Sequence, residues 1–166
     1  MTTAPPRPVA PARACRIADE DPDDLAAHHL VRHEVFVVEQ HLFAGSDRDA
    51  RDDDPATRHV LGLVDGRPAG TVRLYPLADG RWQGDRLAVL PGYRTSGLGV
   101  PLVRFAVATA GELGGTRMLA RVQAANERFF LRLGWTSLGG EDYVGQPHVR
   151  MEIALGRVAP GHSRRV

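Results

Sequence analysis

The stretch that decides the fold is Leu87-Ala-Val-Leu-Pro-Gly-Tyr-Arg-Thr-Ser-Gly-Leu-Gly99, and an apolar run over residues 100–110 follows it. Its first four residues are apolar and predict a strand, which Pro91-Gly92 ends because proline gives the ladder no N–H. Gly97 and Gly99 flank the point at which the next helix begins. A helix N-terminus carries unpaired N–H groups and the positive end of a dipole, so it can hold a phosphate. The stretch therefore predicts a phosphate-binding loop between a strand and a helix.

The spacing of the glycines separates this loop from two other phosphate-binding motifs. From Arg94 to Gly99 it reads R-x-x-G-x-G, whereas the dinucleotide pattern is G-x-G-x-x-G, and Gly99-Val100 does not supply the Lys-Ser/Thr of a P-loop. An ordinary connection between a strand and a helix is the alternative interpretation.

Length and composition indicate one soluble globular domain. Of the 166 residues, 43% are hydrophobic and 25% are charged, which is ordinary for a globular protein. No apolar run approaches the ~20 residues of a membrane span, so we expect no membrane partner. Residues 1–14 are rich in proline and alanine and lack the apolar region of a secretory signal. We expect flexible tails at residues 1–14 and 157–166, on either side of a domain over residues 15–156.

The single cysteine, Cys15, bears on the cellular compartment. One cysteine cannot form an internal disulfide, which favours a reducing cytoplasm. No neighbour in the sequence would activate its thiol, so we interpret Cys15 as a small core residue of a short strand.

Positive and negative charges nearly cancel over the whole chain, but acidic residues are concentrated in one segment. The net charge of +1 gives no global field that would attract nucleic acid. Acidic residues gather in residues 47–54, the acidic segment, which reads D-R-D-A-R-D-D-D. This run lacks the glycine and the terminal glutamate of an EF-hand. We expect a solvated loop without a metal, whose negative charge could attract a cationic amine.

Alternation and turn signals predict a mixed α/β (α+β) fold rather than a purely parallel sheet. Asp21 as N-cap and Pro22 at the first position predict a helix that runs to about Glu39. Asp65-Gly66 predicts a hairpin turn. Further strands are expected at 58–64, 69–77, 82–90, 118–122, 135–138 and 148–155, and further helices at 98–113 and 126–133.

The segment L-A-V-x-P-x-Y followed by R-x-x-G-x-G resembles motif A of the GNAT acyltransferase superfamily, whose members bind acetyl-CoA. The predicted order of elements also matches the GNAT fold, in which helices flank a mixed, mostly antiparallel sheet with a splayed central strand. One helix of that fold would here be short or replaced by the acidic segment. The resemblance implies that the backbone of the loop holds the CoA pyrophosphate through Arg94, Thr95, Ser96, Gly97, Leu98, Gly99 and Val100. It also implies that Leu87, Ala88 and Val89 hold the thioester, with the Val89 N–H polarising its carbonyl.

Phe129-Phe130-Leu-Arg-Leu-Gly134-Trp135 resembles motif B of the same superfamily. Asn126 stands where many members place an Asn or Gln near the CoA arm. Many members carry a tyrosine at the position of Phe130, and that tyrosine protonates the departing thiolate. Phe130 has no proton to give, so water or another group does this work, or acyl transfer is impaired. An amphipathic helix with aromatic core residues is the alternative interpretation of this segment.

Two outer segments resemble the ElaA-like branch of the superfamily. The first, R-x-x-V-F-x-x-E-Q, begins at Arg32 and is followed by D-x-x-D from Asp49 and by His59. The second, Y-x-G-x-P-H-x-x-M, begins at Tyr143 and contains His148.

The resemblance implies a base that takes a proton from an ammonium acceptor, and we choose Glu39 and His148 as candidates. The ordinary pKa of histidine, near 6.5, suits a base at neutral pH. A solvated carboxylate and a structural hydrogen bond are the respective alternatives. His59 and Asp85 are candidates for substrate binding. His59 could instead pair with the acidic segment, and Asp85 alternates with Leu87 and Val89 along one face of the predicted strand.

Together these features predict a cytoplasmic N-acetyltransferase of GNAT fold. It would use acetyl-CoA and no metal, and it would acetylate a primary amine of a small molecule by direct attack in a ternary complex. A homodimer is a candidate assembly. One alternative is an acyl-CoA-binding module without catalytic activity. Another is an N-acyl synthase with longer acyl donors, which would need a wide acyl tunnel.

Overall fold

Seven strands form one sheet in the order β1-β2-β3-β4-β5-β7-β6. The structure is a computed structural model and describes residues 3–7 and 9–156; the C-terminal tail expected at 157–166 lies outside the described residues. The strands are β1 Arg13–Ile17, β2 Arg58–Val64, β3 Arg67–Pro76, β4 Arg81–Val89, β5 Arg117–Gln123, β6 Thr136–Tyr143 and β7 Gln146–Ala154. The helices are α1 Pro22–Arg32, α2 Gly99–Glu112 and α3 Glu127–Arg132, with a π-helical segment η1 His33–Glu39 and the 3₁₀ turns η2 Ala50–Asp53, η3 Pro91–Ser96 and η4 Ala124–Asn126.

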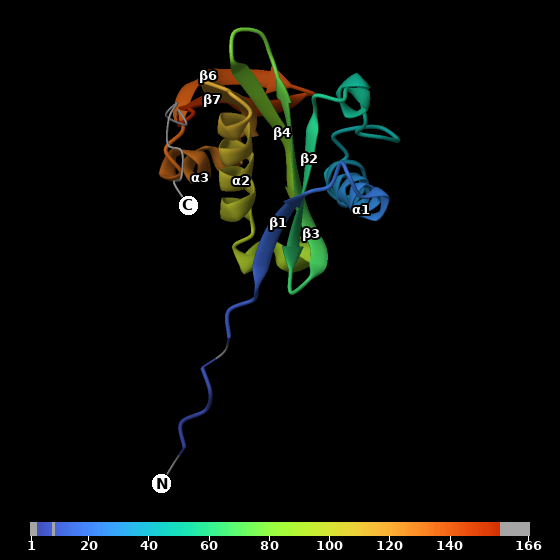
Figure 1. The fold of residues 1–166 in the computed structure, drawn as a ribbon, viewed down its shortest axis with the longest axis vertical. Coiled ribbons are helices and arrows are strands. Elements are labelled where there is room, and N and C mark those ends of the chain that lie inside the picture. Colours follow the sequence, from blue (N-terminus) through green and yellow to red (C-terminus); the bar gives the residue numbers. More distant parts are fainter. Residues whose placement is uncertain (1–2, 8, 157–166) are drawn as a thin grey trace, which may run out of the picture.

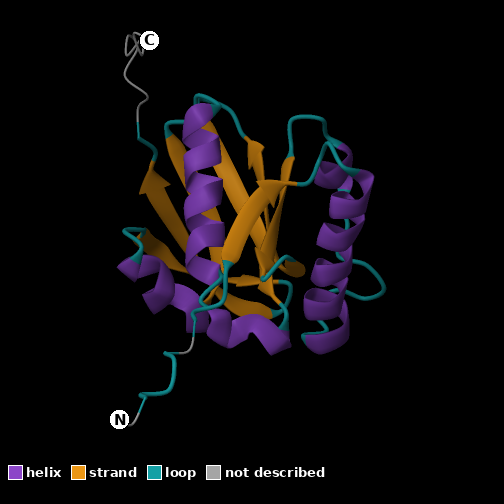
Figure 2. Ribbon diagram, turned by 60° about the horizontal axis from the view of Figure 1, so that its bottom comes forward, coloured by secondary structure: helices purple, strands orange, loops and turns teal. Residues whose placement is uncertain are grey.

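The predicted mixed class and order of elements are confirmed. Neighbouring strands pair antiparallel except β4 and β5, which pair in parallel. Helix α1 covers one face of the sheet and α2 covers the other (Figures 1 and 2). The main apolar core lies between α2, α3 and the sheet and includes Val72, Leu102, Met118 and Phe130. Among the described residues, no helix is long and apolar enough to span a membrane.

Helix α1 begins as the sequence predicts. The side chain of Asp21 accepts hydrogen bonds from the N–H groups of Asp23 and Asp24, and Pro22 takes the first helical position. The helical conformation continues to Glu39 through the π-helical segment. Helix α1 presents polar side chains to the sheet, since His28 and Arg32 are fully buried.

The hairpin between β2 and β3 also forms at its predicted place. Asp65 and Gly66 have φ angles of 49° and 78°, the pair of positive values that a type I′ turn requires. Strand β1 pairs with the outer edge of β2. Cys15 packs partly buried against the core, and burial raises the pKa of its thiol to about 11. The interpretation of Cys15 as a core residue is therefore confirmed.

A bulge in β4 and the end of the β4–β5 pairing open the sheet at its centre. The register between β3 and β4 shifts beside Arg86, whose φ is 52°. Parallel pairing with β5 ends at Gly84 and Ala120. Beyond this point the two strands diverge, as the predicted splay of the central strand requires.

Candidate active site

A cavity occupies the gap between β4 and β5 and reaches both faces of the sheet. Side chains alternate along each strand, so its lining divides into two chambers. The polar chamber lies on the α1 face and is lined by Asp49, Tyr75, Asp85, Arg121, Tyr143 and His148. The apolar chamber lies on the α2 face and is lined by Gly84, Val103, Ala106, Met118, Ala120 and Phe130. A ligand that enters from the α2 face can therefore meet a second ligand from the α1 face inside the gap.

Strand β4 directs backbone N–H groups into this gap. The Leu90 N–H donates to the carbonyl of Ala69, next to β3, at 2.8 Å. Backbone groups alternate in direction along a strand, so the N–H groups of Val89 and Leu87 point away from β3 and toward the gap. These are the strand positions that the sequence assigns to a thioester.

The predicted phosphate loop is a 3₁₀ turn that ends in left-handed Gly97, with a φ of 77°. Arg13 reaches the carbonyl oxygens of Ser96 and Gly97 at 3.5 and 3.3 Å. Because the N–H of the following residue opposes each carbonyl across the peptide plane, the N–H groups of Gly97 and Leu98 point away from Arg13. Helix α2 then begins at Gly99 without a side-chain cap, so its first N–H groups are available to an anion.

Arg94 and Glu39 form an ion pair beside this loop. Both Nη atoms of Arg94 donate to the Glu39 carboxylate, and Arg94 Nε donates to the Val89 carbonyl at 3.1 Å. The hydrogen bond from Arg94 lowers the pKa of Glu39. Glu39 is not among the described residues that line the cavity. The structure thus gives Glu39 a place in holding the loop and does not support it as a base.

His148 lines the polar chamber and is buried, with an edge-to-face contact to Tyr143. Its Nδ1 lies 2.9 Å from the carbonyl oxygen of Gln146. A carbonyl only accepts hydrogen bonds, so Nδ1 carries the proton and Nε2 of the neutral ring has a free lone pair. The structural hydrogen bond is therefore observed, and it uses a different nitrogen from the one that a base would need, so the role of base stays a prediction.

His59 does not line the cavity, and the expectation that it binds substrate is corrected. Its side chain is 2% exposed and lies between two carboxylates, with Nδ1 2.7 Å from Asp19 and Nε2 2.9 Å from Asp52. Asp52 also accepts from Arg32, which is fully buried. The alternative, that His59 pairs with the acidic segment, is the observed arrangement.

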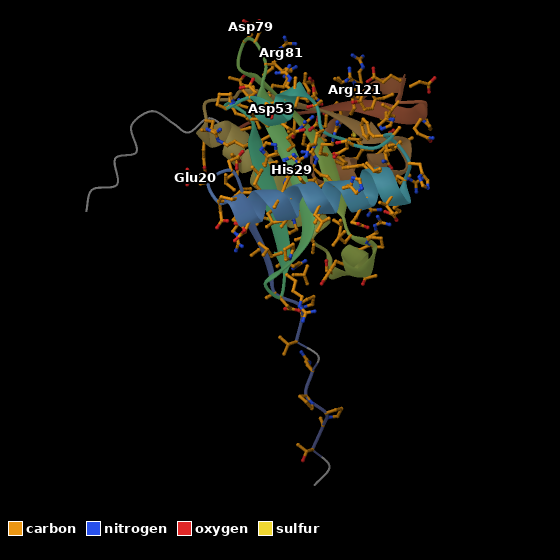
Figure 3. All side chains as sticks on the ribbon, turned by 90° about the vertical axis from the view of Figure 1, so that its right-hand side faces the viewer. Glu20, His29, Asp53, Asp79, Arg81 and Arg121 are labelled. Carbon is orange, nitrogen blue, oxygen red and sulfur yellow. The ribbon has the colours of Figure 1, made fainter. Side chains whose placement is uncertain are left out.

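The acidic segment is solvated only in part, which corrects a second expectation: Asp47 is buried and Asp52 is half-buried, whereas Asp53 is exposed. Asp47 pairs with Arg32 at 2.7 Å and with Arg86 at 3.1 Å. The segment folds against the α1 side of the sheet, where Figure 3 labels His29 and Asp53. Buried guanidinium groups need paired carboxylates, since an unpaired charge in the interior is costly. The aspartates compensate arginines that come from α1, β3 and β4.

Asp85 lines the cavity as predicted, but not through the predicted alternation. Arg73 donates to Asp85 at 2.7 and 2.6 Å and to Asp49 at 2.6 and 3.1 Å. Asp85 thus lies on the α1 face, whereas Leu87 and Val89 pack against the core on the α2 face. The bulge at Arg86 changes the phase of the strand, because it inserts one residue between them.

A pH dependence of stability follows from the buried histidines. Burial opposes the charge on His59, but its hydrogen bonds to Asp19 and Asp52 outweigh this and raise its pKa. Burial lowers the pKa of His29 to about 4 and that of His28 well below its usual value. The stabilisation from charged His59 is complete below its unfolded pKa and is lost as pH rises through the raised folded pKa. The penalty from His28 and His29 grows as pH falls below about 6.5, because the unfolded state then binds more protons.

We therefore expect the free energy of unfolding to be greatest near pH 6.5 and to fall on both sides. Urea denaturation at about pH 5, 6.5 and 8 measures it. His59→Gln should remove the decrease above pH 6.5 and retain the decrease below it. Stability that rises steadily from pH 6.5 to 8 would contradict this assignment.

His29, Asp52 and His59 bring potential ligand atoms within 4.8 Å of one another. Asp52 and both nitrogens of His59 already take part in hydrogen bonds. These contacts fit an ion-pair network, and the absence of a metal from the reaction stays a prediction.

Asn126 and Phe130 both line the cavity, at the end that α3 covers. Phe130 packs edge-to-face on Trp135 at 5.3 Å, so it is also a core residue. The indole Nε1 of Trp135 is buried and has no hydrogen-bond partner among the described residues.

The sequence did not reveal three further residues of the polar chamber, because β3, β5 and the acidic segment come together only in the folded chain. These residues are Asp49, Tyr75 and Arg121.

The splayed parallel pair of strands, the uncapped helix behind a left-handed glycine and the cavity through the sheet are the features that the predicted acyltransferase fold requires. The model of the acetyltransferase (GNAT) family matches residues 15–135. The chain therefore belongs to the GNAT family and is an acyltransferase, and the predicted superfamily is confirmed.

Relatives of known sequence or structure agree with this assignment. The uncharacterized N-acetyltransferase YjcF of Bacillus subtilis (strain 168) is 26% identical over 131 residues, which cover 78% of this chain and 91% of that protein. The structure of an acyl-CoA N-acyltransferase from Pseudomonas aeruginosa is 26% identical, with a TM-score of 0.73 over 86% of this chain and 98% of that chain. Escherichia coli ElaA is 22% identical, with the same TM-score and coverages, and at this identity the likeness shows a common fold.

Proposed function

We propose that this protein transfers an acetyl group from acetyl-CoA to a primary amine of a small molecule. The observation that carries the proposal is the cavity that joins the two faces of the sheet between β4 and β5. The backbone N–H groups of Leu87 and Val89 face it, and His148 lines its polar chamber. A donor on the α2 face and an acceptor on the α1 face would meet there without a covalent enzyme intermediate.

The residues present fit a CoA thioester. The φ of Gly97 is +77°, a left-handed value that side-chain-bearing residues rarely adopt, so this turn of the loop favours glycine, and a glycine leaves the backbone open to close approach by a ligand. The N–H groups at the start of α2 would hold the pyrophosphate. The apolar walls beside α3 would contact the pantetheine arm, with Asn126 as a polar partner. The donor supplies the acyl group as a thioester, whose carbonyl carbon is open to attack.

The chain's own groups account for the transfer of protons and charge. His148 Nε2 would take a proton from the acceptor ammonium, directly or through water. The amine nitrogen then attacks the carbonyl carbon, and the Val89 N–H stabilises the negative charge that develops on the carbonyl oxygen. As the carbon–sulfur bond breaks, the sulfur keeps the electron pair, and the excess proton of the attacking nitrogen reaches the thiolate through water, since Phe130 has no proton to give. A thiolate is a fair leaving group, so an enzyme without this acid can still turn over.

The acceptor would approach through the polar chamber. Asp49 and Asp85 line it, and the hydrogen bonds from Arg73 hold both carboxylates in place. Burial opposes the charge on Asp49, but Arg73 outweighs it and lowers the pKa of that carboxyl. The carboxylates of Asp49 and Asp85 would accept hydrogen bonds from a cationic amine, beside the guanidinium groups of Arg86 and Arg121 that also line the cavity. The cytoplasmic location, the homodimer and the absence of nucleic-acid and membrane partners stay predictions.

Release of free thiol from acetyl-CoA in the presence of primary amines tests the proposed function. The sequence contains no lysine, so the release cannot come from acetylation of the protein's own lysine side chains. We expect amine-dependent release and a product mass increased by one acetyl group. Tight binding of acetyl-CoA without turnover of any amine would favour a module without catalytic activity and would overturn the proposal.

Gly97→Glu is expected to weaken acetyl-CoA binding by about tenfold to thirtyfold. The substitution strains a left-handed position, at a cost of about 1–2 kcal/mol, and places a negative charge beside the phosphate site. Calorimetric titration measures the change. Gly114→Glu is the matched control, because Gly114 has a φ of 90° in open space past the C-terminal end of α2, whereas the loop precedes the start of that helix. Equal effects of the two substitutions would show that strain alone acts and that the loop holds no anion.

A further inference from the structure

The apolar chamber extends past the position of the thioester. Before the bulge at Arg86, the residues of β4 that face α2 are Trp82 and Gly84. After the bulge, the residues that face α2 are Leu87 and Val89. The cavity is lined from Leu87 down to Gly84 on this face, a span of about 10 Å at the usual rise of a strand. The methyl of an acetyl group held at Leu87 and Val89 would occupy only the entrance to this space.

Small residues create the space. Gly84 of β4, Ala106 of α2 and Ala120 of β5 all line the chamber. The backbone of Gly84 is not left-handed, and a Cβ there would meet the flexible end of Met118 at 3.3 Å and, at an ordinary contact distance of 3.9 Å, the carbonyl oxygen of Leu119. Its conformation therefore does not require glycine, and the flexible end of Met118 borders the space that a side chain at position 84 would take.

The walls of this chamber suit a hydrocarbon chain. Ala106 and Met118 are 2% and 1% exposed, and Val103 and Phe130 complete an apolar lining. The ionised side chains of the cavity belong to the polar chamber on the other face and are Asp49, Asp85, Arg86 and Arg121. Burial of methylene groups in such a space is favourable, and each is worth about fourfold in affinity.

We infer that the donors extend beyond acetyl-CoA to thioesters with an aliphatic acyl chain of medium length, such as hexanoyl-CoA. The inference rests on the proposed function, since the same amine attacks the same thioester carbon and the same carbon–sulfur bond breaks. The two reactions differ only in the length of the acyl chain that lies in the apolar chamber. Acetyl is then the shortest of the acyl groups that the site transfers.

The efficiency of thiol release across a series of acyl-CoA donors, with one amine acceptor, tests the inference. We expect kcat/KM for hexanoyl-CoA to exceed that for acetyl-CoA by at least about tenfold. Turnover of acetyl-CoA with equal or poorer use of hexanoyl-CoA would overturn the inference and leave the proposed function intact. Failure to use any thioester would overturn both.

Substitutions in the apolar chamber test whether the acyl chain of the donor lies there. Gly84→Val should lower the ratio of hexanoyl to acetyl efficiency by about tenfold, and Ala106→Val should do so from the opposite wall if Gly84→Val does not fold. Gly140→Val is the matched control, because Gly140 is exposed in β6 outside the cavity and a Cβ there would have only an ordinary contact at 3.7 Å. An unchanged ratio in both chamber variants would show that the chain does not lie there.

Discussion

Asp47→Asn is expected to lower the free energy of unfolding by about 3 kcal/mol. The Asp47 side chain is 3% exposed and pairs with Arg32 and Arg86, whose side chains are 0% and 6% exposed. Removing its charge leaves two buried guanidinium groups with too little negative charge, and breaking a buried pair on one side costs about 3–5 kcal/mol. The lower end applies here, because Asp52 still faces Arg32 and Asp49 still faces Arg86. Urea denaturation at pH 6.5 measures the change.

Asp53→Asn is the matched control for Asp47→Asn. Asp53 lies in the same acidic segment but is exposed, so its substitution should change stability by less than about 0.5 kcal/mol. Equal effects of the two substitutions would show that the network around Asp47 contributes no stability beyond that of a surface carboxylate.

His148→Gln is expected to lower kcat by about 10²–10⁴-fold, the usual contribution of one general base. Glutamine can still donate to the carbonyl of Gln146 but offers no basic nitrogen to the polar chamber. The affinity for acetyl-CoA should stay within about twofold, because the donor binds on the α2 face. Steady-state thiol release gives kcat, and calorimetry gives the affinity.

The pH profile separates the role of a base from a structural role at His148. A general base makes kcat depend on pH, and this dependence should disappear in His148→Gln. His33→Gln serves as control, because His33 lies in the π-helical segment outside the cavity. A variant that keeps the native pH profile with a uniformly lower rate would show that His148 only supports the structure.

Local signals were enough to predict most of the elements. Asp21-Pro22 fixes the start of α1 through a side-chain cap, and Asp65-Gly66 fixes the register of a hairpin through two positive φ angles. The loop from Arg94 to Gly99 was predicted because its glycines act within a few residues of one another. Such features depend on neighbours in the sequence, and the sequence displays them directly.

The contacts between distant segments could not be predicted in the same way. A run of aspartates resembles a solvated loop until Arg32, Arg73 and Arg86 are known to lie beneath it. His59 is between two carboxylates only because β2 passes beside both. The sequence placed Asp85 on the same strand face as Leu87 and Val89. This prediction was wrong because the bulge at Arg86 depends on the pairing of β4 with β3. The structure explains why four residues of the motif that begins at Arg32 occur in one sequence, since they belong to one network of hydrogen bonds and ion pairs. They are Arg32, Asp49, Asp52 and His59.

Calorimetric titration of the protein with acetyl-CoA tests the central claim most directly. We expect a micromolar dissociation constant for the native protein, weaker binding in Gly97→Glu and unchanged binding in Gly114→Glu. No binding of acetyl-CoA or of free CoA at millimolar concentration would contradict the account, because the loop, the splayed strands and the cavity would then have no CoA thioester to hold.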